Sequence, residues 1–177
     1  MTREHITTHA HRFIDKVLAK DMIAVDATAG NGYDTLYLAQ RAKAVIAFDI
    51  QPQAIDATRQ RTQGLSNVTL VLDSHANLAK HVQAMDLIVF NLGYLPHGDP
   101  AVITQTSSTL DALKAAIPLL KDRGHLLITG YRGHPGGLDE TLQAVAYLSA
   151  HQDMHVMDAY TYDEPLAPLF MAFQKRG

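Results

Sequence analysis

The chain has 177 residues, of which 47% are hydrophobic, and a formal net charge of −3 at pH 7. This length suits one domain with a substantial buried core, which we expect to span residues 1–177. The charge indicates no broadly basic surface for nucleic acid, although a local basic site stays open, and the absence of cysteine excludes disulfides, thiolate metal sites and cysteine nucleophiles.

The chain shows no sequence signal for a membrane or for export. No apolar run reaches the roughly 18 residues that span a bilayer. The polar, histidine-rich segment at residues 1–11 is unlike a signal peptide. We therefore expect a cytoplasmic protein that makes no contact with membranes.

Short apolar runs alternate with longer amphipathic stretches along the chain. An opening helix is predicted around residues 13–18, where apolar side chains recur at i, i+4 spacing. Strands are predicted at residues 22–26, 44–49, 68–72, 85–90 and 124–129. Helices are predicted at residues 33–41, 52–63, 106–120 and 138–150, and residues 155–160 and 169–173 are predicted to form a closing antiparallel pair.

This alternation predicts an α/β fold with a doubly wound, mostly parallel sheet and an antiparallel C-terminal strand. In such sheets the ligand binds at the carboxyl ends of the strands, near the point where the strand order reverses. The residues that follow each strand are therefore the candidates for a functional site.

The loop after the first strand reads DATAGNGYDT over residues 26–35. Gly30 and Gly32 allow a sharp turn and a close approach to a ligand, and the free N–H groups of the following helix can bind a carboxylate or phosphate. Asp26 could accept a hydrogen bond from a cationic ammonium group. An ordinary tight turn between strand and helix is the alternative interpretation.

The second strand ends at Asp49, where an acidic residue is placed to accept hydrogen bonds from ribose hydroxyls. A solvated aspartate at a strand end is the alternative. The glycine loop with Asp49 would serve NAD or S-adenosylmethionine (SAM) alike. Thr35 stands where the dinucleotide fingerprint has its third glycine, which argues against NAD.

The third strand is followed by Asp73, Ser74 and His75. In a nucleoside site this loop would lie over the adenine, where Ser74 and His75 could bind the edge of the base or stack on it. A helix N-cap is an equally good interpretation, because Asp and Ser commonly precede helices.

Residues 91–98 after the fourth strand read NLGYLPHG and have the outline N-x-x-Y. Methyltransferases that act on exocyclic amines carry a motif of this outline at the same strand end, usually with prolines in between. The side-chain oxygen of Asn91 and the carbonyl of Leu92 could each accept an N–H and so aim the amine lone pair at a methyl carbon. Tyr94 could stack on a flat base. A buried Asn capping the loop, with Tyr94 as ordinary packing, is the alternative.

A protonated amine has no lone pair, so an aliphatic ammonium substrate would also need a base. His97, Asp99 and His134 are the candidates, and the sequence does not choose among them. The glycine-rich loop at residues 130–137 adds Tyr131 and Arg132. An aromatic ring with an arginine suits single-stranded RNA, whereas a flexible glycine loop is the alternative.

The motifs DATAGNGYDT, FDIQ, DSH, NLGYLP-x-GD and GHPGG together resemble one family over about residues 5–150. It is the rRNA methylase family, which includes the MnmM-type tRNA 5-(aminomethyl)-2-thiouridine methyltransferases. The resemblance implies a Rossmann-like methyltransferase fold, SAM as methyl donor, an aminomethyl nitrogen on the tRNA wobble uridine as acceptor, and a homodimer. It also implies that the cofactor is lined by Asn31, Asp34, Asp49, Gln51, Ser74 and His75.

We therefore predict a SAM-dependent N-methyltransferase that acts on the tRNA anticodon stem-loop by direct in-line transfer, with no metal. An rRNA or other RNA methyltransferase, an NAD-dependent oxidoreductase and a non-catalytic nucleoside-binding module are the alternatives. The predicted cofactor-binding residues are Asp26, Thr28, Gly30, Asn31, Gly32, Asp34, Thr35, Asp49, Gln51, Ser74 and His75. The predicted catalytic residues are Asn91, Leu92 and Tyr94, and the predicted substrate-binding residues are His97, Tyr131, Arg132 and His134.

Overall fold

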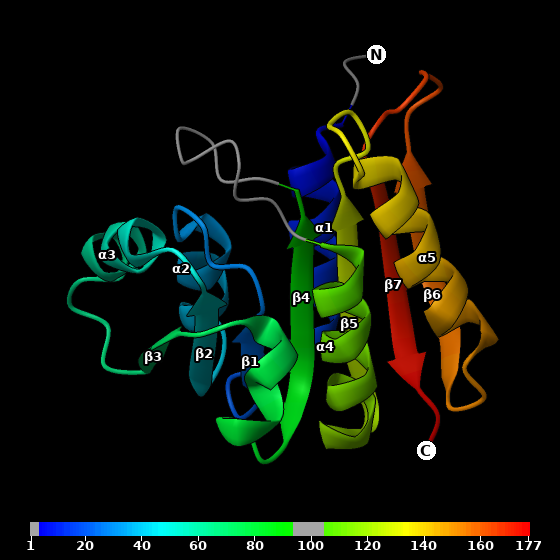
Figure 1. The fold of residues 1–177 in the computed structure, drawn as a ribbon. Coiled ribbons are helices and arrows are strands. Elements are labelled where there is room, and N and C mark those ends of the chain that lie inside the picture. The colour runs from blue at the N-terminus through cyan, green and yellow to red at the C-terminus, as the bar shows by residue number, and fades with distance from the viewer. Residues whose placement is uncertain (1–3, 94–104) are drawn as a thin grey trace.

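The computed structural model describes residues 4–93 and 105–177 and shows helices and strands in alternation (Figure 1). The helices are α1 (Ile6–Val17), α2 (Tyr33–Ala39), α3 (Pro52–Arg61), the 3₁₀-helix η1 (His75–Lys80), α4 (Thr106–Leu119) and α5 (Gly137–Ala150). The strands are β1 (Ile23–Asp26), β2 (Ala44–Asp49), β3 (Val68–Leu72), β4 (Met85–Leu92), β5 (Leu120–Gly130), β6 (Met154–Thr161) and β7 (Leu169–Lys175). No helix in the described ranges is long and apolar enough to span a bilayer.

The strands form one seven-stranded sheet in the order β3-β2-β1-β4-β5-β7-β6. The pairs from β3 to β5 are parallel, and β7 runs antiparallel to both β5 and β6. The predicted α/β sheet with an antiparallel C-terminal strand is therefore confirmed. The strand order reverses between β1 and β4, which is where ligands bind in sheets of this kind.

Helices cover both faces of the sheet, with α4 and α5 in front and α1 behind in Figure 1. Successive side chains of a strand point to opposite faces, and helices cover both faces here. The central strands are therefore apolar on both sides. Leu87 and Val89 pack in the cluster that holds Phe13 of α1, whereas Ile88 and Phe90 pack in the cluster that holds α4 and α5 residues.

Four elements differ most from the sequence prediction. The helix α1 begins at Ile6, seven residues before the predicted start at residue 13. β4 runs on to Leu92, so Asn91 and Leu92 lie in a strand and not in a loop, because they continue the pairing with Thr129 and Gly130 of β5. β5 begins earlier, at Leu120. The 3₁₀-helix η1 was not among the predicted helices, but the alternative interpretation of this loop as a helix N-cap is confirmed: Ser74 caps η1, and its hydroxyl accepts a hydrogen bond from Ala76 N at 3.2 Å.

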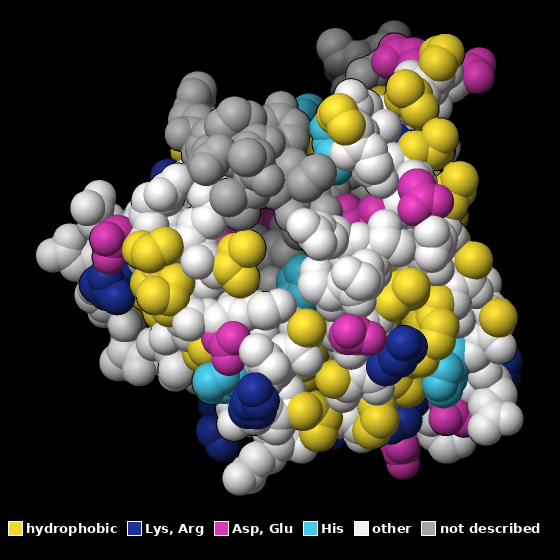
Figure 2. All heavy atoms as spheres, viewed as in Figure 1, with side chains coloured by type: hydrophobic (Ala, Val, Ile, Leu, Met, Phe, Trp, Pro, Cys, Tyr) yellow, Lys and Arg dark blue, Asp and Glu magenta, His cyan; other side chains and the backbone are white. Residues whose placement is uncertain are grey.

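The face drawn in Figure 2 shows Lys and Arg side chains interspersed with Asp and Glu. Among the described residues on this face, the basic side chains form no continuous patch. This distribution agrees with the net charge of −3. Recognition of a nucleic acid on this face would therefore depend on the shape and chemistry of a local site.

Candidate functional site

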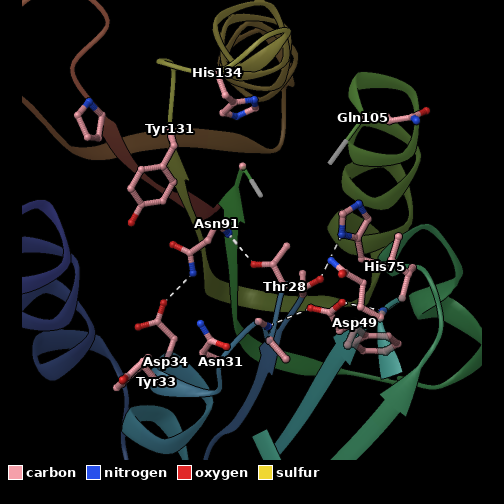
Figure 3. Close-up of a pocket in the computed structure, with 18 of the residues that line it drawn as sticks. Thr28, Asn31, Tyr33, Asp34, Asp49, His75, Asn91, Gln105, Tyr131 and His134 are labelled. Carbon is pink, nitrogen blue, oxygen red and sulfur yellow. Dashed lines mark hydrogen bonds between the residues drawn. The ribbon is translucent and has the colours of Figure 1, made fainter. Parts of the chain in front are cut away.

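The carboxyl ends of the parallel strands surround a cavity of about 1580 Å³ (Figure 3). Pockets for single small ligands measure roughly 300–1,000 Å³, so this cavity has room for a donor molecule and part of an acceptor. It lies at the reversal of strand order between β1 and β4. Residues that follow all five parallel strands contribute to its lining.

The turn after β1 forms one side of the cavity, and Asp49 holds it in place. Gly30 and Gly32 have φ angles of 55° and 79°, in the left-handed region that favours glycine. The carboxylate of Asp49 accepts hydrogen bonds from Gly30 N at 3.0 Å and from Gln51 N at 2.9 Å. The turn is therefore tied to the end of β2, and the Asp49 carboxylate lies at the cavity wall.

Most of the predicted cofactor residues line this cavity. They are Thr28, Gly30, Asn31, Asp34, Asp49, Gln51, Ser74 and His75. Contrary to the sequence prediction, Asp26, Gly32 and Thr35 do not line the cavity: all three are buried, Gly32 within the turn and the other two beneath it.

Asp26 supports the turn from below. Its carboxylate accepts hydrogen bonds from Thr28 N at 3.1 Å and from Thr35 Oγ1 at 2.6 Å, and the residue is completely buried. Burial, with a smaller contribution from the nearby Asp34 carboxylate, raises the pKa of Asp26 to about 7. A side chain so enclosed cannot reach a ligand's ammonium group, because strand β1 turns it inward under the loop.

His75 lines the cavity and has an unpartnered ring nitrogen. Its Nδ1 lies 3.1 Å from the carbonyl of Ala27 and must donate the hydrogen there, which leaves Nε2 as an acceptor. This Nε2 is buried and has no hydrogen-bond partner within the described residues. Burial lowers the pKa of His75 and so favours its neutral form. An N–H donor such as the exocyclic amine of an adenine would satisfy this nitrogen.

Asn91 lies at the opposite side of the cavity, at the end of β4. Its backbone N–H donates to Thr28 Oγ1 at 2.8 Å, and its side-chain Nδ2 donates to Asp34 Oδ2 at 2.7 Å (Figure 3). A carboxylate only accepts, so the Asn91 atom that faces it is the NH₂ group. The Oδ1 oxygen of Asn91 is therefore the atom available to accept an N–H from a ligand.

Contrary to the sequence prediction, Leu92 does not line the cavity. Leu92 is completely buried, and its carbonyl accepts a hydrogen bond from Tyr131 N at 2.9 Å as β4 pairs with β5. The carbonyl that was expected to orient an amine thus forms a hydrogen bond within the sheet. Tyr94 and His97, like Asp99, lie outside the described residues.

The sequence analysis missed the contribution of α1. His5, Thr7 and His11 come from the start of this helix and line the cavity. His11 Nε2 lies 2.6 Å from Asp34 Oδ1. Three histidines between residues 5 and 11 were the sequence signal, and their spacing does not tell which of them face the cavity.

The loop after β5 supplies Tyr131, Arg132 and His134, and all three line the cavity. Burial raises the pKa of the Tyr131 hydroxyl, so the ring stays neutral. Arg132 donates to the carbonyl of Ala167 and to Thr161 Oγ1, so its guanidinium is largely engaged by the β6–β7 end of the sheet. Tyr131 is therefore better placed than Arg132 to contact an acceptor.

Within residues 4–93 and 105–177, no group of three His, Asp or Glu side chains could hold a metal ion. The polar groups of the cavity are instead arranged as two sets. Asp49 and His75 lie on the β2–β3 side, and Asn91 and Asp34 lie on the β4 side. His11 of α1 lies beside Asp34. This arrangement suits a nucleoside on one side and an amine or amide N–H group on the other.

Comparison with known proteins gives relatives over nearly the whole chain. Residues 45–175 match the family described as "Putative rRNA methylase". The chain is 33% identical to a chloroplastic tRNA (mnm(5)s(2)U34)-methyltransferase of Arabidopsis thaliana, over 98% of this chain and 70% of that protein.

Two crystal structures are similar in both sequence and fold. One is an rRNA-methylase from Clostridium thermocellum. It has 29% identity to this chain and a TM-score of 0.91, with 99% of this chain and 100% of that one covered. The other is a methyltransferase from Streptococcus mutans in complex with S-adenosylhomocysteine (SAH). It has 36% identity and a TM-score of 0.87, with 98% and 99% of the two chains covered.

Proposed function

Since this chain belongs to the rRNA methylase family and is a SAM-dependent methyltransferase, we propose that it methylates the aminomethyl nitrogen of 5-aminomethyl-2-thiouridine at the tRNA wobble position. One observation carries the proposal: the Asn91 side chain and the Asp34 carboxylate are joined at 2.7 Å in the wall of the cavity. The Arabidopsis relative, whose name specifies a modified uridine at position 34 of tRNA, supports the choice of substrate.

The residues on the β2–β3 side fit the nucleoside part of SAM. The Asp49 carboxylate would accept the ribose hydroxyls, and the unpartnered Nε2 of His75 would accept a hydrogen from the adenine amine. The glycine turn would allow the close approach of the remainder of the cofactor. When bound, SAM supplies an electrophilic methyl group carried on a sulfonium.

The residues on the β4 side would orient the acceptor nitrogen. Asn91 Oδ1 accepts one N–H of the amine, which fixes the direction of the nitrogen lone pair. The Asp34 carboxylate, bonded to the same asparagine, supplies a negative charge near the nitrogen as that atom becomes positive. An amine with two N–H groups can donate one to Asn91 Oδ1 and one to the Asp34 carboxylate. A tertiary amine or a carbon acceptor has no N–H to donate to either.

The remaining features of the proposal concern the acceptor's surroundings. The Tyr131 ring would lie against the modified base, as aromatic side chains do in single-stranded RNA recognition. The anticodon stem-loop as the part of tRNA that is bound, the homodimer, the cytoplasmic location and the single domain over residues 1–177 stay predictions. So do the roles of Tyr94 and His97.

The test is methyl transfer from isotopically labelled SAM to purified tRNA, read by mass spectrometry of the nucleosides. We expect label on tRNA that carries 5-aminomethyl-2-thiouridine and none on the same tRNA with an unmodified wobble uridine. Label found on ribosomal RNA instead, with the modified tRNA untouched, would contradict the proposal. That outcome would identify an rRNA methyltransferase.

A prediction for His75 follows from its unpartnered Nε2. The wild-type protein is expected to bind SAH about tenfold more tightly than S-inosylhomocysteine, which lacks the exocyclic amine, because one hydrogen bond is worth about 1.5 kcal/mol. His75→Leu should bind the two ligands equally. Calorimetric titration of both proteins with both ligands measures the difference. If His75→Leu still preferred SAH about tenfold, as the wild type does, His75 would not be the residue that contacts the adenine amine.

A further inference from the structure

Three elements meet in a chain of hydrogen bonds at the acceptor side of the cavity. Asn91 of β4 donates to Asp34 Oδ2 at 2.7 Å, and Asp34 Oδ1 lies 2.6 Å from Nε2 of His11 on α1. The Asp34 and His11 side chains are about four-fifths buried, with exposures of 22% and 21%. Because the carboxylate accepts from both neighbours, His11 carries its hydrogen on Nε2.

The His11 ring is held in one orientation by its neighbours. It stacks on Tyr37 with ring centroids 3.6 Å apart and an angle of 16° between the planes. The Tyr37 hydroxyl donates to Asp15 at 2.8 Å, and the Arg41 guanidinium lies 3.5 Å from the centroid of the Tyr37 ring. The buried side chains of Phe13 and Ile14 anchor α1 itself in the core.

This support determines which atom of Asn91 meets a ligand. The amide of Asn91 can turn about its last torsion, and the two orientations present either Oδ1 or Nδ2 to the cavity. Asp34 selects the orientation with Oδ1 in the cavity because its own oxygen accepts from Nδ2. The Asp34 carboxylate can also turn, and the N–H of His11 holds its second oxygen.

We propose that His11 is a positioning residue for methyl transfer, which acts through Asp34 to keep Asn91 Oδ1 directed at the acceptor nitrogen. The inference rests on the proposed function, since it takes Asn91 as the group that binds that nitrogen. His11 and Asp34 both precede the region matched by the family, which begins at residue 45. In this role His11 acts on the acceptor nitrogen only through Asp34 and Asn91 and makes no direct contact with the substrate.

Two substitutions separate the hydrogen bond from the ring. His11→Phe keeps a flat ring to stack on Tyr37 but has no N–H, whereas His11→Gln loses the ring and keeps an amide N–H in reach of Asp34. We expect His11→Phe to lower kcat about 10- to 100-fold, since a misplacement of about 1 Å has effects of that size. KM for tRNA and Kd for SAH should stay within about twofold, and His11→Gln should recover most of the lost kcat.

His9 provides a matched control on the same helix. Its Nε2 lies 2.8 Å from Asp158 of β6, and its ring stacks on Tyr160 at 4.2 Å with an angle of 4° between the planes. His9→Phe thus removes the same kind of histidine–aspartate bond, away from Asn91. We expect it to lower Tm as much as His11→Phe does while leaving kcat unchanged.

A second measurement does not depend on the substrate. Hydrogen exchange of the Asn91 side-chain NH₂, followed by NMR on the protein with SAH bound, should be slow in the wild type and in His11→Gln and fast in His11→Phe. Unchanged exchange in His11→Phe, or an equal loss of kcat in His11→Phe and His11→Gln, overturns the inference. Absence of methyl transfer by the wild type overturns the proposed function alone, because the exchange result stands without it.

Discussion

Asn91→Ala is expected to lower kcat for methyl transfer by about 100- to 1,000-fold, the effect of removing one preorganised polar contact from a reacting group. The substitution removes the Oδ1 acceptor and also releases the Asp34 carboxylate that Nδ2 contacts at 2.7 Å. The affinity for SAH should stay within about twofold, because Asp49 and His75 lie on the other side of the cavity. Single-turnover kinetics with saturating labelled SAM measure the chemical step directly.

The control for this prediction is an amide–carboxylate pair outside the cavity. Gln143 of α5 donates to Asp139 at 2.8 Å on the protein surface, so Gln143→Ala removes the same kind of bond and should leave kcat unchanged. Turnover within threefold of the wild type in Asn91→Ala would rule out Asn91 as the group that orients the acceptor. A parallel loss of SAH affinity would instead assign Asn91 to the cofactor.

Asp26→Asn is expected to change the pH dependence of stability more than any other single substitution at this site. The pKa of Asp26 is raised from 3.8 to about 7 in the folded protein, so the folded state keeps a proton that the unfolded state releases. This contribution to stability is fully present below pH 3.8 and is lost as pH rises towards 7. The loss amounts to about 4 kcal/mol at most, at 1.36 kcal/mol per pKa unit.

Asparagine has no proton to lose at this position, and its amide can still meet Thr28 N and Thr35 Oγ1. The stability of Asp26→Asn relative to the wild type should therefore increase by a few kcal/mol between pH 5 and pH 8. Urea unfolding at each pH measures this difference, which cancels the titration of groups that both proteins share. Parallel curves for the two proteins would show that Asp26 does not hold a proton in the folded state.

Asp26→Ala serves as the contrasting variant. It leaves Thr28 N and Thr35 Oγ1 without their acceptor under the turn, which costs about 1–3 kcal/mol for each buried group. We expect it to be less stable than Asp26→Asn at every pH. Equal stability of the two variants would mean that these hydrogen bonds do not support the turn.

The fold and one half of the site were within reach of the sequence. Apolar runs that end at Asp49 and just before Asn91 predicted parallel strands, and parallel strands bring their carboxyl ends to one edge of the sheet. The structure places Asp49, His75, Asn91 and Tyr131 around one cavity at that edge. The antiparallel closing pair was predicted from its position after the last helix, and β6 and β7 confirm it.

The errors in the predicted site concern the end of β4 and the orientation of Asp26, which local sequence patterns do not determine. Whether β4 stops at residue 90 or continues depends on its pairing with β5, in which the Leu92 carbonyl accepts a hydrogen bond from Tyr131 N. Whether Asp26 faces a ligand or the interior depends on how the turn folds over it. Residue spacing alone decides neither outcome, because the first depends on a neighbouring strand and the second on the path that the turn takes over Asp26.

What the sequence by itself determined is the order of strands and helices, the glycine turn and the polar residues at the strand ends, since hydrophobic periodicity and turn chemistry are local properties. Only the tertiary structure decided that α1 packs with His11 against Asp34 and that Asp34 holds Asn91. The packing of a helix on a sheet depends on the shapes of both surfaces. The sequence of α1 therefore contains His11, but the cavity acquires it only when the core around Phe13 and Ile14 is assembled.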